Sequence, residues 1–300
     1  MSYEIDTVCI HGDGHRTEDK NCAISYPIYQ TASFSHLTPG YNPSGFDYSR
    51  ESNPTRAYLE ETVSALEGAC DTIAFSSGMA AISAVFEYFR PGDHIICSED
   101  LYGGVVRLAA VVMSKKRCQV DFVDTSDLNA LKAAVKENTR AIYVETPSNP
   151  MMLVTDIRAV SRIAKEAGAL LIVDNTFMTP YFQNPLGLGA DVVIHSGTKY
   201  LSGHNDTICG FLCSKDQKLA QHFRLISKTI GGTLAPFESW LCLRGLKTLA
   251  LRMERHQSNA LAAAEWLKKQ DCVENVEIAL IFSNYFKNIV DIPEKMCYKI

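Results

Sequence analysis

Polar residues follow five short apolar runs of the sequence, and their types are those that bind cofactors and move protons. The runs are TIAF, HIIC, AIYV, LLIV and DVVI, and the polar segments after them are residues 76–79, 98–104, 145–150, 174–176 and 195–200. If the runs are strands of an open α/β sheet, these segments lie at the carboxyl ends of the strands. Such sheets bind their ligands at that edge.

The segment Ser77-Gly78-Met79 stands directly before a helical pattern. The unpaired backbone N–H groups of a helix start can bind a phosphate, and Ser196 and Thr198 could add hydroxyl donors. These residues also have ordinary explanations, because a serine before a helix is a common N-cap and Ser and Thr are common in turns.

Three further side chains could contact the rest of a ligand. Asp174 could cap a helix, bind a metal ion or pair with a protonated ring nitrogen. Tyr102, beside two glycines, could stack on a planar ring or serve in packing. Lys199 follows an apolar run and a Ser-Gly-Thr turn, and it could be a solvated charge or an amine that forms a Schiff base.

Together these groups suit a ligand with a phosphate, a planar ring, a cationic ring nitrogen and an aldehyde, which describes pyridoxal phosphate (PLP). Other cofactors fit less well. The sequence has no Gly-x-Gly-x-x-Gly after a strand, no Gly-x-x-x-x-Gly-Lys-Ser/Thr and no His-Glu-x-x-His. Cys209 and Cys213 could in principle hold a metal ion, but no pair of cysteines has Cys-x-x-Cys spacing and buried free thiols explain them better, so no metal is predicted.

The elements that would position these groups alternate between strand and helix patterns. The apolar runs predict strands at 72–75, 94–97, 119–123, 141–144, 170–173, 192–194 and 208–213, with helices at 58–68, 79–89, 104–115, 128–136 and 157–167. This alternation predicts β-α units on a mostly parallel sheet. Runs such as LLIV and DVVI are apolar enough to be buried on both faces.

The chain changes character along its length. Residues 1–57 are irregular and rich in Ser, Pro, Gly, Asn and Tyr, and residues 236–270 predict a helix interrupted around Arg244 and Gly245. Residues 275–300 have no clear period. We therefore predict an N-terminal arm at 1–57, a PLP-binding α/β domain at 58–246, and a linking helix with a truncated or divergent C-terminal domain at 247–300.

Composition excludes several classes of protein. The chain has 300 residues and a formal net charge of −5, which argues against an electrostatic nucleic-acid binder. It has no apolar run of about 20 residues and no signal-peptide pattern, so no membrane partner is expected. Its ten cysteines lack Cys-x-x-Cys spacing and several lie in apolar runs, which favours buried thiols and a cytoplasmic location.

Six motifs in order carry a resemblance to a known family. They are Tyr48-Ser49-Arg50 with Asn53-Pro54-Thr55, then residues 76–81, Tyr102-Gly103-Gly104, residues 145–150, residues 174–177 and residues 196–200. With them the chain, from about residue 24 to 276, resembles the trans-sulfuration enzymes: cystathionine γ-synthase, cystathionine lyase and methionine γ-lyase. The resemblance implies an α/β, fold-type-I PLP-dependent transferase with a mostly parallel seven-stranded sheet flanked by helices.

The resemblance also implies a role for each site residue. Lys199 would form the Schiff base and move protons, Asp174 would keep the ring nitrogen protonated, and Tyr102 would stack on the ring. Asn149 would lie near the ring oxygen and Arg107 would face the carboxylate of an amino-acid substrate. The phosphate would be held by Ser77, Gly78, Met79, Ser196 and Thr198 of one subunit and by Tyr48 and Arg50 of its neighbour.

Cross-subunit contacts of this kind imply a homo-oligomer, at least a dimer and in this family a dimer of dimers. The implied activity is β- or γ-elimination or replacement on cystathionine, an acyl-homoserine or a related substrate, as a lyase or a transferase. Glu51 stands where some synthases for succinylated substrates carry a second arginine, which argues against an added anionic substrate arm.

After Val276 the sequence departs from the family, so we expect an incomplete C-terminal α+β domain. Two alternatives follow from this departure: a PLP-binding remnant with little or no turnover, or a scaffold without cofactor.

Overall fold

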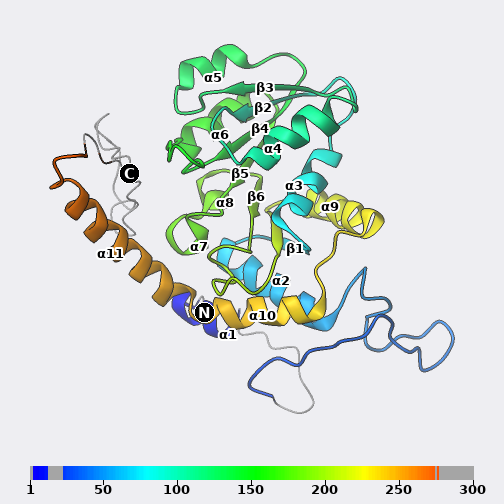
Figure 1. The fold of residues 1–300 in the computed structure, drawn as a ribbon. Helices are drawn as coiled ribbons and strands as arrows, with labels where there is room; N and C mark the ends of the chain where they lie inside the picture. The colour runs from blue at the N-terminus through cyan, green and yellow to red at the C-terminus, as the bar shows by residue number, and fades with distance from the viewer. Residues whose placement is uncertain (1–2, 13–22, 274–275, 277–300) are drawn as a thin grey trace. The chain divides into compact units, whose positions relative to one another are not determined.

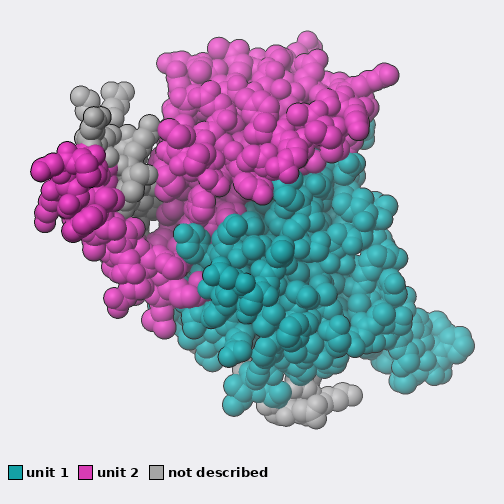
Figure 2. Space-filling view, viewed as in Figure 1, with its two compact units in different colours: residues 1–90, 191–249 teal, residues 91–190, 250–300 magenta. Residues whose placement is uncertain are grey.

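The computed structural model describes residues 3–12, 23–273 and 276, and the chain divides into two compact units (Figure 2). Unit 1 contains residues 1–90 and 191–249, and unit 2 contains residues 91–190 and 250–300. Unit 1 is thus built from two distant stretches of the sequence. The domains predicted at 1–57, 58–246 and 247–300 rest on the composition and pattern of the sequence, whereas the two units are defined by contacts in space. The predicted domains therefore stay a prediction.

Seven strands form a sheet in the order β1-β7-β6-β5-β4-β2-β3 (Figure 1). They are β1 (Asp71–Phe75), β2 (His94–Ser98), β3 (Gln119–Val123), β4 (Thr139–Glu145), β5 (Leu170–Asp174), β6 (Val192–His195) and β7 (Gly210–Ser214). Strand β2 runs parallel to β3 and β4, and β4 runs parallel to β5. Strand β7 is antiparallel to β1 and β6. The predicted mostly parallel seven-stranded sheet is confirmed, and each predicted strand lies within two residues of its expected bounds.

The helices of unit 1 are α1 (Ile5–His11), α2 (Pro54–Glu67), α3 (Gly78–Glu87), α9 (Gln217–Ile230) and α10 (Pro236–Leu246). Helix α2 begins where the Asn53 side chain accepts a hydrogen bond from the Thr55 N–H at 3.0 Å, with Pro54 in the first turn. It ends at Gly68, which adopts a left-handed conformation. Helices α3 and α9 pack on β1 and β7.

The helices of unit 2 are α4 (Gly103–Leu108), which continues as a π-helix (Ala109–Met113), α5 (Leu128–Ala134), α6 (Ile157–Glu166), α7 (Thr179–Phe182) and α8 (Pro185–Leu188). Helix α11 (Leu249–Leu267) belongs to unit 2 from residue 250 onward. Strands of both units bury both faces: every residue of β2 and of β7 is buried. Each fully buried Ile, Leu or Phe side chain contributes roughly 1.5–3 kcal/mol by leaving water.

Two sequence expectations about helices are corrected. Arg244 and Gly245 are helical, and the interruption falls between Leu246 and Leu249 instead. Gly245 packs so closely against the Ser202 backbone that a Cβ atom would lie 2.0 Å from the carbonyl oxygen, so this helical position needs glycine. The predicted helix at 104–115 is present but changes from α to π geometry after Leu108.

The cysteines of the described residues carry thiols and form no disulfide. Six of these cysteines are buried, as expected, but Cys70 and Cys272 are exposed. Within the described ranges, no helix is long and apolar enough to cross a membrane. The predicted incomplete C-terminal domain falls mainly on residues 277–300, which lie outside the described residues.

Candidate active site

Unit 1 brings the first strand-to-helix turn against the turn that precedes Lys199. The Ser77 side chain caps α3 by accepting the Ala80 N–H at 3.0 Å, so the N-cap explanation of this serine is correct as far as it goes. The next residue, Gly78, lies so close to Ser196 that a Cβ atom would be 2.9 Å from the serine Cβ. Gly78 and Ser196, two of the residues predicted to hold a phosphate, therefore meet although they are far apart in the sequence, and the start of α3 lies beside Ser196.

Gly210 lies directly behind this turn. It pairs with Phe75 where β7 runs antiparallel to β1, and a Cβ atom at this position would lie 2.2 Å from the Ser77 carbonyl oxygen. Only glycine fits that separation, because the atoms that crowd it belong to the backbone. The sequence reading missed Gly210, although a glycine inside an apolar strand is a known sign of close backbone approach.

Replacing Gly210 with alanine should displace the Ser77–Gly78 turn. We expect a loss of roughly 1–3 kcal/mol in the free energy of unfolding, the usual cost of overpacking, together with weaker PLP binding. Urea unfolding and PLP titration measure the two effects. Gly232→Ala is the matched control, because its added Cβ atom would make ordinary contacts, the closest at 3.5 Å. Equal stability and PLP affinity in both variants would contradict the close approach.

Lys199 lies in a turn, residues 197–202, whose first half is anchored by contacts on two sides. Thr198 Oγ1 accepts the Cys209 N–H at 3.1 Å and donates to the Cys209 carbonyl at 3.1 Å. On the other side, the buried His195 Nε2 lies 2.6 Å from Glu67 Oε1 at the end of α2. The lysine side chain itself is exposed. A rigid turn that presents an exposed amine suits covalent attachment of a carbonyl group.

A hollow of about 410 Å³ opens beside Lys199 and Thr198. It is completed by Asn205, Asp206, Thr207 and Ile208, none of which the sequence reading selected. Thr207 is 6% exposed, and its Oγ1 has no hydrogen-bond partner among the described residues. The polar run that precedes β7 is the signal that could have identified these residues.

Unit 2 places Asp174 at the end of β5, where three donors hold its side chain. The carboxylate is 7% exposed and accepts the Tyr143 hydroxyl at 3.2 Å. Its other oxygen accepts the Thr176 N–H at 3.0 Å and the Thr176 hydroxyl at 2.6 Å. Among the described residues no group of three or more possible metal ligands exists, so the metal-ligand explanation of Asp174 has no support there.

Glu145 ends β4 directly opposite Asp174, because the parallel register of β4 and β5 pairs the two residues. Glu145 is 5% exposed, and its Oε2 accepts the Tyr102 N–H at 2.7 Å. Burial, followed by the charge of Asp174, raises the pKa of Glu145 to about 8. The sequence reading did not select Glu145, although its place at a strand end is the signal that singled out Asp174.

A raised carboxyl pKa couples protonation to folding. Between about pH 4.5 and pH 8 the unfolded chain has lost the Glu145 proton while the folded chain keeps it, so stability falls as pH rises through this window. In the cofactor-free protein, the free energy of unfolding of wild type minus that of Glu145→Gln should therefore fall by roughly 2–4 kcal/mol from pH 5 to pH 8. Urea unfolding at several pH values measures this difference. Parallel pH profiles for the two proteins would show that Glu145 titrates normally.

Three further predicted site residues, Tyr102, Arg107 and Asn149, belong to unit 2. Tyr102 precedes α4 and is 48% exposed, and Arg107 is exposed in the last turn of α4. Asn149 is partly buried. The adjacent loop is fixed by Asp100, whose Oδ2 accepts from the Ser148 hydroxyl and from the Met151 N–H.

Tyr48 and Arg50 lie in the arm that precedes α2. The Arg50 guanidinium stands 5.2 Å from the centre of the Tyr48 ring, and its Nη1 donates to the Lys228 carbonyl at 2.5 Å. Both side chains are exposed. The arm thus presents a cation and an aromatic hydroxyl together on the surface of unit 1.

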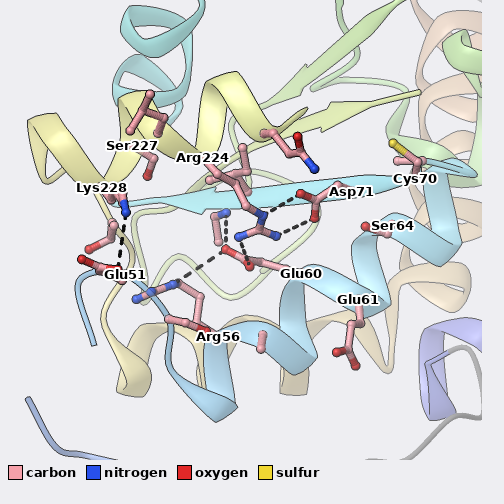
Figure 3. A pocket seen from close by; sticks show the side chains of 18 of the residues that line it. Glu51, Arg56, Glu60, Glu61, Ser64, Cys70, Asp71, Arg224, Ser227 and Lys228 are labelled. Atoms are coloured by element: carbon pink, nitrogen blue, oxygen red, sulfur yellow. Dashed lines mark hydrogen bonds and ion pairs between the residues drawn. The ribbon is translucent and has the colours of Figure 1, made fainter. Parts of the chain in front are cut away.

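A second hollow in unit 1, of about 890 Å³, lies between α2, β1 and α9 (Figure 3). Its charged side chains are largely paired with one another: Arg224 bonds to Asp71 at 2.5 and 2.6 Å and to Glu60 at 3.0 Å, and Lys228 lies 3.6 Å from Glu51. None of the residues predicted to bind cofactor or substrate lines it. We interpret these ion pairs as links that join three elements of the fold.

The residues of unit 1 fit a phosphate-bearing aldehyde. The close approach at Gly78 sets the Ser196 side chain beside the start of α3, and the hollow at Lys199 holds an amine and a hydroxyl without a partner among the described residues. In unit 2, a carboxylate held by three donors suits a ring nitrogen that carries a proton.

Comparison with known proteins agrees with this chemistry. The chain is 49% identical to the cystathionine beta-lyase of Lactococcus lactis subsp. cremoris over 272 residues. The aligned residues cover 91% of this chain and 71% of that protein. It is 46% identical over 277 residues to the cystathionine gamma-synthase of Haemophilus influenzae, covering 92% and 74%.

Solved structures agree as well. The crystal structure of cystathionine gamma-lyase from Lactobacillus plantarum complexed with L-serine matches 90% of this chain and 70% of that chain, with a TM-score of 0.86 and 44% identity. The model of the protein family described as "Cys/Met metabolism PLP-dependent enzyme" matches residues 6–288. The chain therefore belongs to the Cys/Met metabolism family of PLP-dependent enzymes.

Proposed function

We propose that this enzyme eliminates or replaces the group at Cβ or Cγ of a sulfur-containing or acylated amino acid, with Lys199 as the residue that carries PLP. The observation that supports this most directly is the exposed Lys199 amine, on an anchored turn whose Ser196 contacts the start of α3. The similar proteins are named for the beta-lyase, gamma-lyase and gamma-synthase reactions, and the proposal covers all three.

The residues divide the work. Bound PLP supplies a sink for the electrons left at the substrate Cα when its proton is removed. Lys199 Nζ takes the proton from Cα. Asp174 would keep the ring nitrogen of bound PLP protonated, and Tyr102 would stack on the ring. The residues proposed to bind the phosphate are Ser77, Gly78, Met79, Ser196 and Thr198, with Asn149 near the ring oxygen and Arg107 near the substrate carboxylate.

A substrate panel tests the proposal. The PLP-loaded chain should release pyruvate from cystathionine if it is a β-lyase and 2-oxobutyrate if it is a γ-lyase, and should form cystathionine from cysteine and an acyl-homoserine if it is a synthase. Lys199→Ala should do none of these. No turnover of any substrate by a chain that binds PLP would overturn the proposal. No feature of the described residues favours the alternative of a remnant without turnover.

We also propose that Tyr48 and Arg50 bind the phosphate held by a neighbouring subunit, in a dimer or a dimer of dimers. Their exposure on the arm supports this, and arginine offers phosphate two parallel hydrogen bonds. A cytoplasmic location is proposed as well, because the cysteines of the described part of the chain are thiols.

Subunit mixing tests the arm. Arg50→Ala and Lys199→Ala proteins should each be nearly inactive, but their hybrid contains one site with Lys199 from one subunit and Arg50 from the other. Random exchange should restore roughly a quarter of wild-type activity, because half of the dimers are hybrids with one intact site of two. Activity is assayed after exchange that mass spectrometry confirms. Confirmed hybrids without recovered activity would place the arm on its own subunit.

A further inference from the structure

The Tyr102 side chain is exposed, and the residues next to it in the sequence do little to fix its position. Its side chain is 48% exposed, and it precedes α4 without a side-chain cap. Two glycines follow it, and in the described part of the chain no heavy atom from outside this stretch of helix lies within 4 Å of the position that a Cβ atom would take at Gly103. A ring that stacks on a ligand must keep a fixed plane, so the main chain at Tyr102 needs an anchor.

Glu145 provides that anchor. Its Oε2 accepts the Tyr102 N–H at 2.7 Å, across 43 residues of sequence. Glu145 is itself fixed, because it is the last residue of the buried strand β4 and pairs with Asp174 in the sheet. The hydrogen bond therefore ties the tyrosine to the same strand ends that carry Asp174.

We propose that Glu145 is a positioning residue that holds the main chain of Tyr102, so that the tyrosine ring lies flat against the cofactor ring. This inference rests on the proposed function, because it assumes that Tyr102 stacks on PLP. Glu145 does not touch the cofactor in this role but acts through Tyr102.

The surroundings of Glu145 show which substitution can serve as the control that keeps the hydrogen bond to Tyr102. Asp174 on β5, Asp100 after β2 and the Tyr143 hydroxyl on β4 face this carboxyl, and burial with the nearby negative charges raises its pKa and favours its neutral form. A glutamine is neutral, has the same length and offers a carbonyl oxygen to the Tyr102 N–H. Glu145→Gln should therefore preserve the anchor, whereas Glu145→Ala removes it and Glu145→Asp shortens it by one methylene group.

A double-mutant cycle on the full chain tests the inference at pH 7. Cofactor-stripped proteins are titrated with PLP, and the visible absorbance gives the dissociation constant while visible circular dichroism reports how the bound ring is oriented. Glu145→Ala and Glu145→Asp should weaken PLP binding roughly tenfold and change the dichroism. In the Tyr102→Ala background the same substitutions should change the dissociation constant less than about twofold, because the anchored ring is already absent. Glu145→Gln should stay within about threefold of wild type.

The outcomes separate the inference from the proposed function. Equal weakening by Glu145→Ala in both backgrounds would overturn the inference, because the glutamate would then act without Tyr102. Wild-type affinity and dichroism in both Glu145→Ala and Glu145→Asp would overturn it as well. Neither result affects the role of Lys199, which the wild-type absorbance reports. A wild-type chain that forms no visible absorbance with PLP would overturn the proposed function together with the inference.

Discussion

Replacing Lys199 with alanine should abolish the visible absorbance of the PLP-loaded protein and lower turnover by at least about 10⁴-fold. The side chain would supply both the amine that bonds to the cofactor aldehyde and the base that takes the substrate proton, so one substitution removes two functions. Absorbance spectra and borohydride trapping followed by peptide mass spectrometry measure the covalent bond. Steady-state assays measure the turnover.

Lys218→Ala is the control for this experiment. Lys218 is exposed in the first turn of α9, in the same unit as Lys199, and does not line the hollow beside it. Its removal should leave both the spectrum and the turnover unchanged. A trapped adduct on another lysine of the Lys199→Ala protein would show that the assignment is wrong.

Replacing Asp174 with asparagine should lower turnover by roughly 10²- to 10³-fold while PLP still binds. The buried carboxylate would lose its charge beside a protonated ring nitrogen, and breaking a buried ion pair costs about 3–5 kcal/mol. The asparagine keeps the size of the side chain and can still accept from Tyr143 or Thr176, so its position should change little. Turnover at saturating PLP and the cofactor content per chain give the two readouts.

Thr176→Val tests the orientation of the Asp174 carboxylate separately from its charge. It removes the hydroxyl that donates to Asp174 at 2.6 Å but leaves the carboxylate and the Thr176 N–H in place. We expect a loss of about tenfold or less, the scale of one hydrogen bond. An Asp174→Asn protein with turnover near that of wild type would exclude the proposed role of the carboxylate.

Much of the fold was predictable because its signals are local. Each strand is a short apolar run, and the polar residues after it stand out against that background, which is how Asp174 and Lys199 were selected. Helix α9 has equally local signals, an Asp216 side chain that accepts the Leu219 N–H and a left-handed Gly231 at its end, yet the sequence reading did not include it. That omission was a missed signal and not a limit of the sequence.

Glu145 and Gly210 could not be assigned in the same way. Their importance depends on which strands become neighbours: β4 beside β5 sets Glu145 against Asp174, and β7 beside β1 sets Gly210 against Ser77. The strand order β1-β7-β6-β5-β4-β2-β3 does not follow the order in the chain. Local periodicity carries no information about that order, because it describes each strand alone.

The sequence by itself determined the class of the fold, the position of the strands and the residue types available for PLP chemistry, since these depend on burial patterns and on the chemistry of single side chains. The tertiary structure decided which of those residues act together. It set Gly78 against Ser196, gave Tyr102 its anchor on Glu145, and buried Glu145 beside Asp174 strongly enough to raise its pKa to about 8. These contacts join residues that are 29 to 118 positions apart, and only the packing of the sheet makes them neighbours.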